Sequence, residues 1–422
     1  MPGRHAVIER SMKSAKNLFL KILKWASAAM LALYFFVILI FGFRDSDGNV
    51  SVRYLRLPGW EALHKRVHAE LNGIDGPYLF GDTLYQVNKD HRLVSRQVSR
   101  GDSMLVRVNN EDNDAFYVHL RSRYEVEQAV YPQPSRLLAI SDIEGNFNAF
   151  QSFLVCNEVI DTNYNWTFGD GHLVLLGDFV DRGEDVIQVL WLAYSLEEKA
   201  EEHCGKVHFI LGNHEILNIE GHAKYVDEKY IRVAQEISGE QDWKKALRYI
   251  FSEHAELGRW LRTKNSVEKI GGHLFVHAGL SPETPGLCLS LTEINDIVRK
   301  NIGRDLYHEP GDDETANFLL GKTSPLWYRG LAAKYKYYLK ASEEELDEIL
   351  DYFEAEKVVV GHVVVDDVAT DYDGKLIKID LKHSRDKCSG DTKGLLVKDG
   401  IAFKVDDLGN EEVLEDEDLA VY

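Results

Sequence analysis

Short apolar runs that end at side chains able to bind a metal ion recur between residues 136 and 362 of this chain. Residues 172–176 lead into Asp178, and residues 206–211 lead into Asn213. Apolar runs of this length, bounded by Gly, are typical of buried strands. In an open α/β sheet, ligands bind at the loops that follow the carboxyl ends of the strands. Three further runs follow the same pattern, and the five together deliver Asp142 with Glu144, Asp178, Asn213, His277 and His362.

A single Asp or His at a strand end is weak evidence of a site, because such residues usually face solvent or cap a helix. Five in succession indicate that their loops converge on one crevice. Carboxylate oxygen and imidazole nitrogen suit Mn, Fe or Zn, and the absence of Cys from the set argues against a thiolate site. The sequence therefore predicts an α/β fold with a metal-binding crevice at the strand ends.

Five short motifs carry these residues. They are Asp142-Ile-Glu-Gly145, Gly177-Asp-Phe-Val-Asp-Arg-Gly183, Gly212-Asn-His-Glu215, His277-Ala-Gly279 and Gly361-His362. The set resembles the calcineurin-like metallophosphoesterase superfamily, and within it the phosphoprotein-phosphatase branch, particularly its bacterial, Shewanella-like members. The resemblance covers roughly residues 136–405. It implies a four-layer α/β/β/α sandwich and two divalent metal ions.

The resemblance also implies a division of labour among the ligands. Asp178 bridges the two ions, and the remaining ligands divide between a first site and a second site. Two divalent ions about 3.5–4 Å apart acidify a bridging water and clamp the phosphoryl group. By resemblance, the first site takes Asp142, Glu144 and Asp178, and the second takes Asp178, Asn213, His277 and His362.

Four further residues receive roles from the resemblance. Arg182 and Arg329, the latter within residues 324–330, bind the phosphate oxygens together with Asn213. A planar guanidinium matches these oxygens through two hydrogen bonds. His214 protonates the leaving oxygen, and Asp181 holds its tautomer and charge. The residues alone leave two alternatives open: Arg182 pairs with Asp181 or Asp185 at the surface, or His214 caps the following helix.

Glu144 departs from the family pattern, which has His at this position. Three carboxylates around the first ion leave two divalent ions a net charge of roughly +1 instead of +2, so the bound water becomes less acidic. An oxygen-rich site favours Mn²⁺ or Mg²⁺ over Zn²⁺. We expect Mn, with Mg, Fe or Zn as alternatives, and an alkaline pH optimum. The competing interpretation is a degenerate first site in an inactive binding domain.

A second strong feature is the uncharged segment of 19 residues at positions 25–43. As a helix it is about 28 Å long, close to the hydrocarbon core of a bilayer. The basic segment 1–24 precedes it, which places the N-terminus in the cytoplasm. The expectation is a single-pass inner-membrane anchor with the catalytic domain in the periplasm. A cleaved signal peptide is the alternative, although its apolar region is shorter and ends at a small-residue cleavage site.

The remaining boundaries follow from composition. Residues 44–135 alternate apolar and polar residues between turn signals, which predicts a small β-rich juxtamembrane module. Residues 136–405 form the predicted catalytic domain, and residues 406–422 an acidic tail. The chain carries a net charge of −20, and residues 1–44 carry +6, which leaves about −26 beyond them. Such an acidic region repels nucleic acid. Cys156, Cys204, Cys288 and Cys388 form no C-x-x-C motif, and we expect mostly free, buried thiols.

The combined interpretation is a membrane-anchored, metal-dependent phosphomonoester hydrolase. Its expected substrate is a phosphorylated Ser, Thr or Tyr side chain of a protein, and nucleic acid is not an expected partner. One alternative is a diadenosine-polyphosphate or other nucleotide hydrolase. The other is a catalytically inactive, membrane-anchored binding protein.

Overall fold

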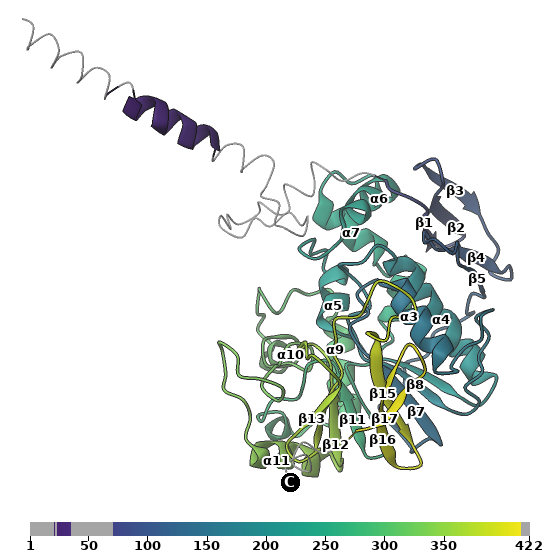
Figure 1. Ribbon diagram of the computed structural model, residues 1–422, viewed down its shortest axis with the longest axis vertical. Helices are drawn as coiled ribbons and strands as arrows, with labels where there is room; N and C mark the ends of the chain where they lie inside the picture. Colours follow the sequence, from purple (N-terminus) through teal and green to yellow (C-terminus); the bar gives the residue numbers. More distant parts are fainter. Residues whose placement is uncertain (1–20, 22, 35–70, 415–422) are drawn as a thin grey trace, which may run out of the picture. The chain divides into compact units, whose positions relative to one another are not determined.

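The structure, a computed structural model, describes residues 21, 23–34 and 71–414. The chain divides into two compact units, residues 1–63 and 64–422. Residues 23–34 of the first unit are helical and exposed. The second unit contains all the described strands (Figure 1).

Two six-stranded sheets form the centre of the second unit. The first has the strand order β17-β16-β15-β7-β8-β9, and the second has the order β13-β14-β12-β11-β10-β6. The strands of the first sheet are β7 (Arg136–Ile140), β8 (His172–Leu175), β9 (Lys206–Phe209), β15 (Lys393–Lys398), β16 (Ile401–Asp406) and β17 (Glu411–Val413). Those of the second are β6 (Val130–Tyr131), β10 (Val267–Ile270), β11 (His273–Val276), β12 (Lys357–Val360), β13 (Ala369–Asp371) and β14 (Leu376–Lys378).

The two sheets face each other across a buried apolar layer. Leu137 and Ala139 of β7 enter this layer together with Phe275 of β11 and Val359 of β12. Leu138, the residue between the two on β7, belongs instead to a separate core on the other side of the sheet. This alternation follows from the two-residue period of a strand. The continuous apolar runs therefore form strands that are buried on both faces of the sheet, as the sequence predicted.

Helices cover the outer face of each sheet. Ile140 of the first sheet packs in a core with residues of six helices, and Leu274 of the second packs in a core with residues of three others. The predicted α/β sandwich is therefore confirmed, with helices on both sides (Figure 1). The first group is α3 (Phe147–Cys156), α4 (Val186–Glu201), α5 (Asn213–Ile219), α6 (Glu228–Ser238), α7 (Trp243–Ile250) and α8 (Glu256–Leu261). The second group is α9 (Leu291–Asn301), α10 (Glu314–Leu320) and α11 (Glu343–Phe353), with the short 3₁₀ turn η1 (Pro285–Leu287) before α9.

Residues 71–135 are rich in strands and share a core with the catalytic sheets. A three-stranded sheet holds β1 (Asp75–Phe80), β2 (Thr83–Val87) and β3 (Leu93–Gln97), and a hairpin holds β4 (Met104–Arg107) and β5 (Ala115–Val118). Trp191 of α4 donates its indole N–H to the Pro77 carbonyl at 2.7 Å, and both segments contribute to one buried cluster. The second catalytic sheet already includes β6, which lies before the predicted boundary at residue 136.

Three predictions concern the ends of the chain and the cysteines. Within the residues that the structure describes, no helix is long and apolar enough to cross a bilayer. The predicted anchor at 25–43 is described only as far as residue 34, and residues 35–70 and 415–422 lie outside the described residues. All four cysteines are free, as expected. The expectation of burial is wrong, because Cys204, Cys288 and Cys388 are exposed and Cys156 is only partly buried.

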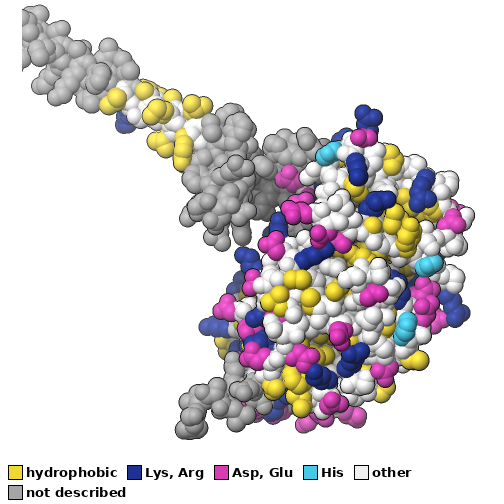
Figure 2. Space-filling model, turned by 45° about the vertical axis from the view of Figure 1, so that its right-hand side comes forward, with side chains coloured by type: hydrophobic (Ala, Val, Ile, Leu, Met, Phe, Trp, Pro, Cys, Tyr) yellow, Lys and Arg dark blue, Asp and Glu magenta, His cyan; other side chains and the backbone are white. Residues whose placement is uncertain are grey.

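Acidic and basic side chains are interspersed over the face of the molecule shown in Figure 2. Ion pairs among the described residues include Lys387 with Asp114 at 2.5 Å and Lys375 with Asp347 at 2.6 Å. The net charge of −20 reflects 69 Asp and Glu residues against 49 Lys and Arg residues in the whole chain.

Candidate active site

The five predicted ligand loops meet at the carboxyl ends of the central strands of the two sheets. Strands β7, β8 and β9 run parallel in the first sheet, and β11 and β12 run parallel in the second. Parallel strands place their carboxyl ends at the same edge, where the following loops can converge. Asp142, Asp178, Asn213, His277 and His362 all lie within a few residues of these ends, and all five are buried.

His277 lies at the centre of a cluster of four ligand-type side chains. Its Nε2 atom is 3.1 Å from Oδ2 of Asp178, 3.1 Å from Oδ1 of Asn213 and 3.2 Å from Nδ1 of His362. Its Nδ1 atom lies 2.8 Å from the Leu176 carbonyl oxygen. A proton on Nδ1 is donated to that carbonyl, so Nε2 faces the cluster, where it can bind a cation in place of a second proton. The structure thus brings together all four residues predicted for the second ion.

The charges in this cluster suit a bound cation. Burial disfavours the charged form of His277, yet the Asp178 carboxylate outweighs it and raises the pKa of His277 to about 10. Burial and the neighbouring His277 lower the pKa of His362 well below its usual value, so this imidazole is neutral. Its Nε2 atom is buried without a hydrogen-bond partner among the described residues. Such an atom costs free energy unless it has a ligand, and a divalent ion supplies one.

Asp142 adjoins this cluster through His362. Its Oδ2 atom accepts hydrogen bonds from the His362 backbone N–H at 3.1 Å and from the Ser141 hydroxyl at 2.5 Å. Burial raises the pKa of Asp142, and the nearby Asp178 carboxylate raises it further. An ion between Asp142 and Asp178 relieves this repulsion, because it favours the charged form of Asp142 beside the Asp178 carboxylate. The burial of Asp178 is outweighed by His277 and His214, which lower its pKa. The first predicted site therefore has two suitable carboxylates.

Glu144 is engaged by an arginine. Its carboxylate forms an ion pair with the Arg182 guanidinium, and the two side chains are 24% and 47% exposed. The tight buried cluster of metal-ligand side chains in the described residues consists of Asp178, His277 and His362. Glu144 as a metal ligand and Arg182 as a phosphate ligand therefore both stay predictions. The surface ion pair suggested for Arg182 exists, but its partner is Glu144 rather than Asp181 or Asp185.

His214 and Asp181 form a buried pair beside the cluster. The Nδ1 atom of His214 lies 2.6 Å from Oδ2 of Asp181, and Asn218 donates to Oδ1 of the same carboxylate at 2.7 Å. Burial disfavours the charged imidazole, but the carboxylates of Asp178 and Asp181 outweigh it and raise the pKa of His214. The His214 backbone N–H also donates to Asp178 at 2.8 Å. A protonated imidazole held in this way is suited to general-acid chemistry.

The imidazole ring of His214 does not cap the following helix. Helix α5 begins at Asn213, and the Glu215 carboxylate accepts the Gly212 backbone N–H at 2.8 Å. The same carboxylate accepts the backbone N–H groups of Asp178 and Phe179 at 2.9 and 2.8 Å. Glu215 thus ties the loop after β8 to the start of α5, a positioning role that the sequence did not reveal.

Arg329 lies on the second sheet's side of the site. Its Nη1 atom donates to the His362 carbonyl oxygen at 2.7 Å, and its backbone N–H donates to the Tyr338 hydroxyl at 2.7 Å. Its guanidinium lies over the Tyr335 ring, 5.5 Å from the centroid. These contacts place Arg329 next to the cluster, in keeping with the predicted phosphate-binding role.

The loops that carry the site hold strained backbone. Asp142, Glu144, Asp178, Asp181 and His362 all have φ between +50° and +71°, as does Arg182 at +55°. Only a few per cent of residues other than Gly adopt this left-handed region, Asn, Asp and His more often than the rest, and strain of this kind concentrates at functional sites. The shared left-handed conformation of these six residues supports the assignment of their loops to one site.

Asp380 is a nearby carboxylate that the sequence analysis did not select. It is buried and follows β14, the strand paired with β12. Burial and the Asp142 carboxylate raise the pKa of Asp380 to about 9. The same strand-end rule that found Asp142 applies to Asp380, but its strand is only three residues long.

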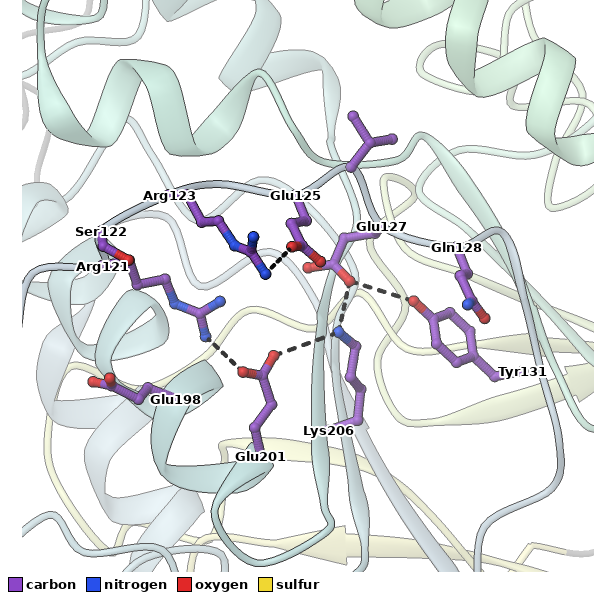
Figure 3. A pocket seen from close by; sticks show the side chains of 11 residues that line it. Arg121, Ser122, Arg123, Glu125, Glu127, Gln128, Tyr131, Glu198, Glu201 and Lys206 are labelled. Atoms are coloured by element: carbon purple, nitrogen blue, oxygen red, sulfur yellow. Dashed lines mark hydrogen bonds and ion pairs between the residues drawn. The ribbon is translucent and has the colours of Figure 1, made fainter.

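A separate pocket lies at the opposite edge of the first sheet (Figure 3). Lys206, the first residue of β9, lines it together with Glu127 and Tyr131. The Lys206 ammonium is 2.6 Å from the Glu127 carboxylate, and the Tyr131 hydroxyl donates to that carboxylate at 3.3 Å. Its position at the amino end of β9 separates this pocket from the ligand loops.

A known family's sequence model matches most of the predicted catalytic domain. The sequence model of the calcineurin-like phosphoesterase family matches residues 135–366. The chain belongs to this family. The phosphoesterase is therefore a hydrolase of the phosphatase type, and the family implies that it uses divalent metal ions.

Relatives of this phosphoesterase include proteins named as phosphatases. Shewanella-like protein phosphatase 1 of Plasmodium berghei is 28% identical over 228 residues, which cover 54% of this chain and 60% of that protein. Shewanella-like protein phosphatase 2 of Arabidopsis thaliana is 36% identical over 108 residues, 26% of this chain and 28% of that protein. The crystal structure of the cold-active protein-tyrosine phosphatase of a psychrophilic Shewanella species matches with a TM-score of 0.69 and 28% identity. That match covers 82% of this chain and 100% of the other.

Proposed function

We propose that this phosphoesterase removes phosphate from phosphorylated Ser, Thr or Tyr side chains of proteins, using two divalent ions, of which Mn²⁺ is the best candidate. The observation that carries the proposal is the paired arrangement of His214 with Asp181 beside the His277 ligand cluster. One group offers a proton to a leaving oxygen, and the other offers ligands to a cation. The names of the relatives as protein phosphatases support the substrate class.

The residues divide the work as follows. Two ions, when bound, activate water and clamp the phosphoryl group. In this proposal Asp178, Asn213, His277 and His362 hold one ion, and Asp142, Glu144 and Asp178 hold the other. Arg182 turns from Glu144 toward the phosphate oxygens, while Arg329 approaches them from the other side and Asn213 contributes its amide. His214 holds a proton on Nε2 and gives it to the leaving oxygen, because Asp181 fixes Nδ1.

The surface beside Arg329 supports a polypeptide substrate. Tyr335 and Tyr337 are partly exposed, and the Lys336 ammonium lies 4.6 Å from the Tyr337 ring centroid. The Lys322 ammonium lies at the same distance from that ring. In a chain of net charge −20, this local group of aromatic and cationic side chains favours an acidic peptide around the phosphorylated residue.

A substrate panel tests the proposal. The metal-free full chain is reconstituted separately with Mn²⁺, Mg²⁺, Fe²⁺ and Zn²⁺ and assayed on phosphopeptides, diadenosine tetraphosphate and an aryl phosphate. We expect the highest kcat/KM on phosphopeptides. Preference for the dinucleotide would favour the nucleotide-hydrolase alternative. Hydrolysis equal to that of His214→Asn on every ester would favour the inactive binding protein.

We propose in addition that residues 25–43 anchor the chain in the inner membrane with the catalytic domain in the periplasm. The uncharged run and the preceding basic residues support this. Protease added to intact spheroplasts should digest the catalytic domain while cytoplasmic proteins survive. Protection of the domain in spheroplasts, or its release by alkaline carbonate, would contradict the anchor.

A further inference from the structure

A second group of metal-ligand side chains lies outside the catalytic cluster. His222 follows α5, while Asp305 and His308 follow α9. Oδ2 of Asp305 is 2.9 Å from Nε2 of His222, and Oδ1 is 2.6 Å from Nδ1 of His308. One ligand atom from each residue lies within 4.8 Å of the others. None of the three belongs to the motifs that supply the catalytic ligands.

A fourth ligand-type side chain adjoins the group at His222. The Glu220 carboxylate has Oε2 3.5 Å from Nε2 of His222, and its side chain is only 3% exposed. Two imidazoles and two carboxylates from two separate loops therefore converge. The Lys244 ammonium lies 3.9 Å from Oδ2 of Asp305. The Glu220 carboxylate instead contacts the His222 imidazole, so the two carboxylates meet at that ring.

The environment of the group allows an ion to enter. The side chain of Asp305 is 8% exposed, whereas that of His308 is 49% exposed. Asp305 also lines an open pocket of about 510 Å³, whose wall includes Lys244 and Arg304. The ligands are thus buried on the Glu220 side and reachable from solvent on the His308 side. A functional ion site needs such a route.

We propose that Glu220, His222, Asp305 and His308 form a third divalent-cation site, separate from the catalytic pair, with Zn²⁺ as the preferred ion. Four nitrogen and oxygen ligands match the tetrahedral coordination of Zn²⁺. The distances of 2.6 and 2.9 Å between Asp305 and the two imidazoles are hydrogen-bond distances. Ligands of one zinc ion stand roughly 3.3 Å apart, given bond lengths of about 2.0–2.2 Å. Small side-chain rotations therefore convert the hydrogen-bonded group into the coordinated one.

The third ion has a structural route to the active site. The rings of His308 and Tyr307 have centroids 4.8 Å apart, those of Tyr307 and Trp327 4.4 Å, and those of Trp327 and His362 5.9 Å. An ion that fixes His308 also restricts Tyr307, which packs on Trp327 at the edge of the catalytic cluster. The site therefore clamps the loop after α9 next to the substrate-side surface.

Metal counting on the full chain tests the third site. The purified protein is stripped with chelator, titrated with Zn²⁺, and examined by native mass spectrometry and by thermal unfolding. The variants are His222→Ala and His308→Ala, and the matched control is His254→Ala, an exposed histidine outside any ligand group. We expect wild type and the control to bind one more Zn²⁺ than the two variants, or to bind it at least about 10-fold more tightly. Zn²⁺ should raise the unfolding temperature less in the variants.

A catalytic-site variant separates this site from the dinuclear centre. In Asp178→Asn, which removes the bridging carboxylate, we expect the Zn²⁺ that depends on His222 and His308 to persist. Equal Zn²⁺ stoichiometry and affinity in wild type, His222→Ala and His308→Ala would overturn the proposal. Loss of all bound Zn²⁺ in Asp178→Asn would overturn it as well. Because the readout is bound metal, the result does not depend on the enzyme's substrate.

Discussion

The carboxylate of Glu144 forms an ion pair with the guanidinium of Arg182. The sequence assigned the first residue to a metal ion and the second to phosphate. Each partner therefore has to leave the other before it can take its predicted role. A cation that captures Glu144 frees Arg182 for phosphate, and phosphate that captures Arg182 frees Glu144 for a cation. Such mutual release is a positive coupling between metal and phosphate binding.

The substitution Glu144→His tests how this carboxylate sets the choice of metal. It restores the family's neutral nitrogen ligand and removes one negative charge. We expect wild type to work best with Mn²⁺ or Mg²⁺ at alkaline pH, and Glu144→His to gain activity with Zn²⁺ and to shift its optimum toward neutral pH. Activity of the metal-free proteins reconstituted with each ion across a pH series measures this. A Zn²⁺ optimum near pH 6 in wild type would contradict the explanation.

His214→Asn should lower kcat by about 10²–10⁴-fold, the usual contribution of a general acid. Bound metal should change little, because the ring of His214 is hydrogen-bonded to Asp181 and its Nε2 atom lies 3.7 Å from Oδ2 of Asp178, beyond hydrogen-bond distance. The loss should be smallest for an aryl phosphate, whose phenolate leaves without a proton. His203→Asn, at an exposed histidine outside the site, is the control. An equal loss on aryl and alkyl phosphates would rule out proton donation by His214.

Gly212→Ala should displace the predicted metal ligand Asp178, because a Cβ atom there would lie within 2.6 Å of both its side chain and its backbone nitrogen. A Cβ atom at this position would lie 2.2 Å from Oδ1 of Asp178, and the φ of Gly212 is −96°. We expect loss of bound metal and of most activity. Gly286→Ala is the matched control, because a Cβ atom there meets nothing within 4 Å. Mass spectrometry under native conditions and circular dichroism distinguish lost metal from lost fold. Full metal occupancy in Gly212→Ala would show that Asp178 does not hold an ion in this position.

Glu127 gives the fold a specific acid sensitivity. Burial favours its neutral form, but Lys264 and Lys206 outweigh burial and lower the pKa of Glu127 to about 2. Because this folded-state pKa lies below the ordinary value near 4.5, the stabilisation is complete above pH 4.5 and is lost as the pH falls toward 2. A pKa shift of this size corresponds to a contribution of at most about 3 kcal/mol to the free energy of unfolding.

Urea unfolding of wild type and Glu127→Gln at pH 7, 4 and 3 measures this contribution. The difference in unfolding free energy should be largest at pH 7 and should shrink as the pH falls. Glu412→Gln, at an exposed carboxylate of β17, is the control and should show a small difference at every pH. A Glu127→Gln difference that is constant from pH 7 to 3 would contradict the prediction.

The strand-end rule recovered most of the site from sequence because each ligand follows a buried apolar run. It did not select Asp380, which lies two residues after the end of β14. It also missed β6, a pair of residues that joins the second sheet by parallel pairing with β10. The pairing of Glu144 with Arg182 was out of reach for a different reason. It depends on positive φ at both residues, +50° and +55°, and sequence patterns do not report backbone dihedrals at loop positions.

The thiols show where the rule of apolar burial fails. Cys204 and Cys288 both adopt positive φ, 61° and 54°, in the segments that follow α4 and η1. Both turns lie at the surface, and the two thiols are exposed there. Composition alone therefore predicted burial that local backbone geometry does not permit.

The ligands that meet around His277 come from both halves of the sandwich. Asp178 and Asn213 follow strands of one sheet, and His277 and His362 follow strands of the other. An ion held by all four would be a non-covalent cross-link between the two sheets at the active site. Removing the ion with a chelator should therefore weaken the contact between the two sheets as well as stop turnover. Amide hydrogen exchange in the ligand loops should become faster before exchange in the outer helices does.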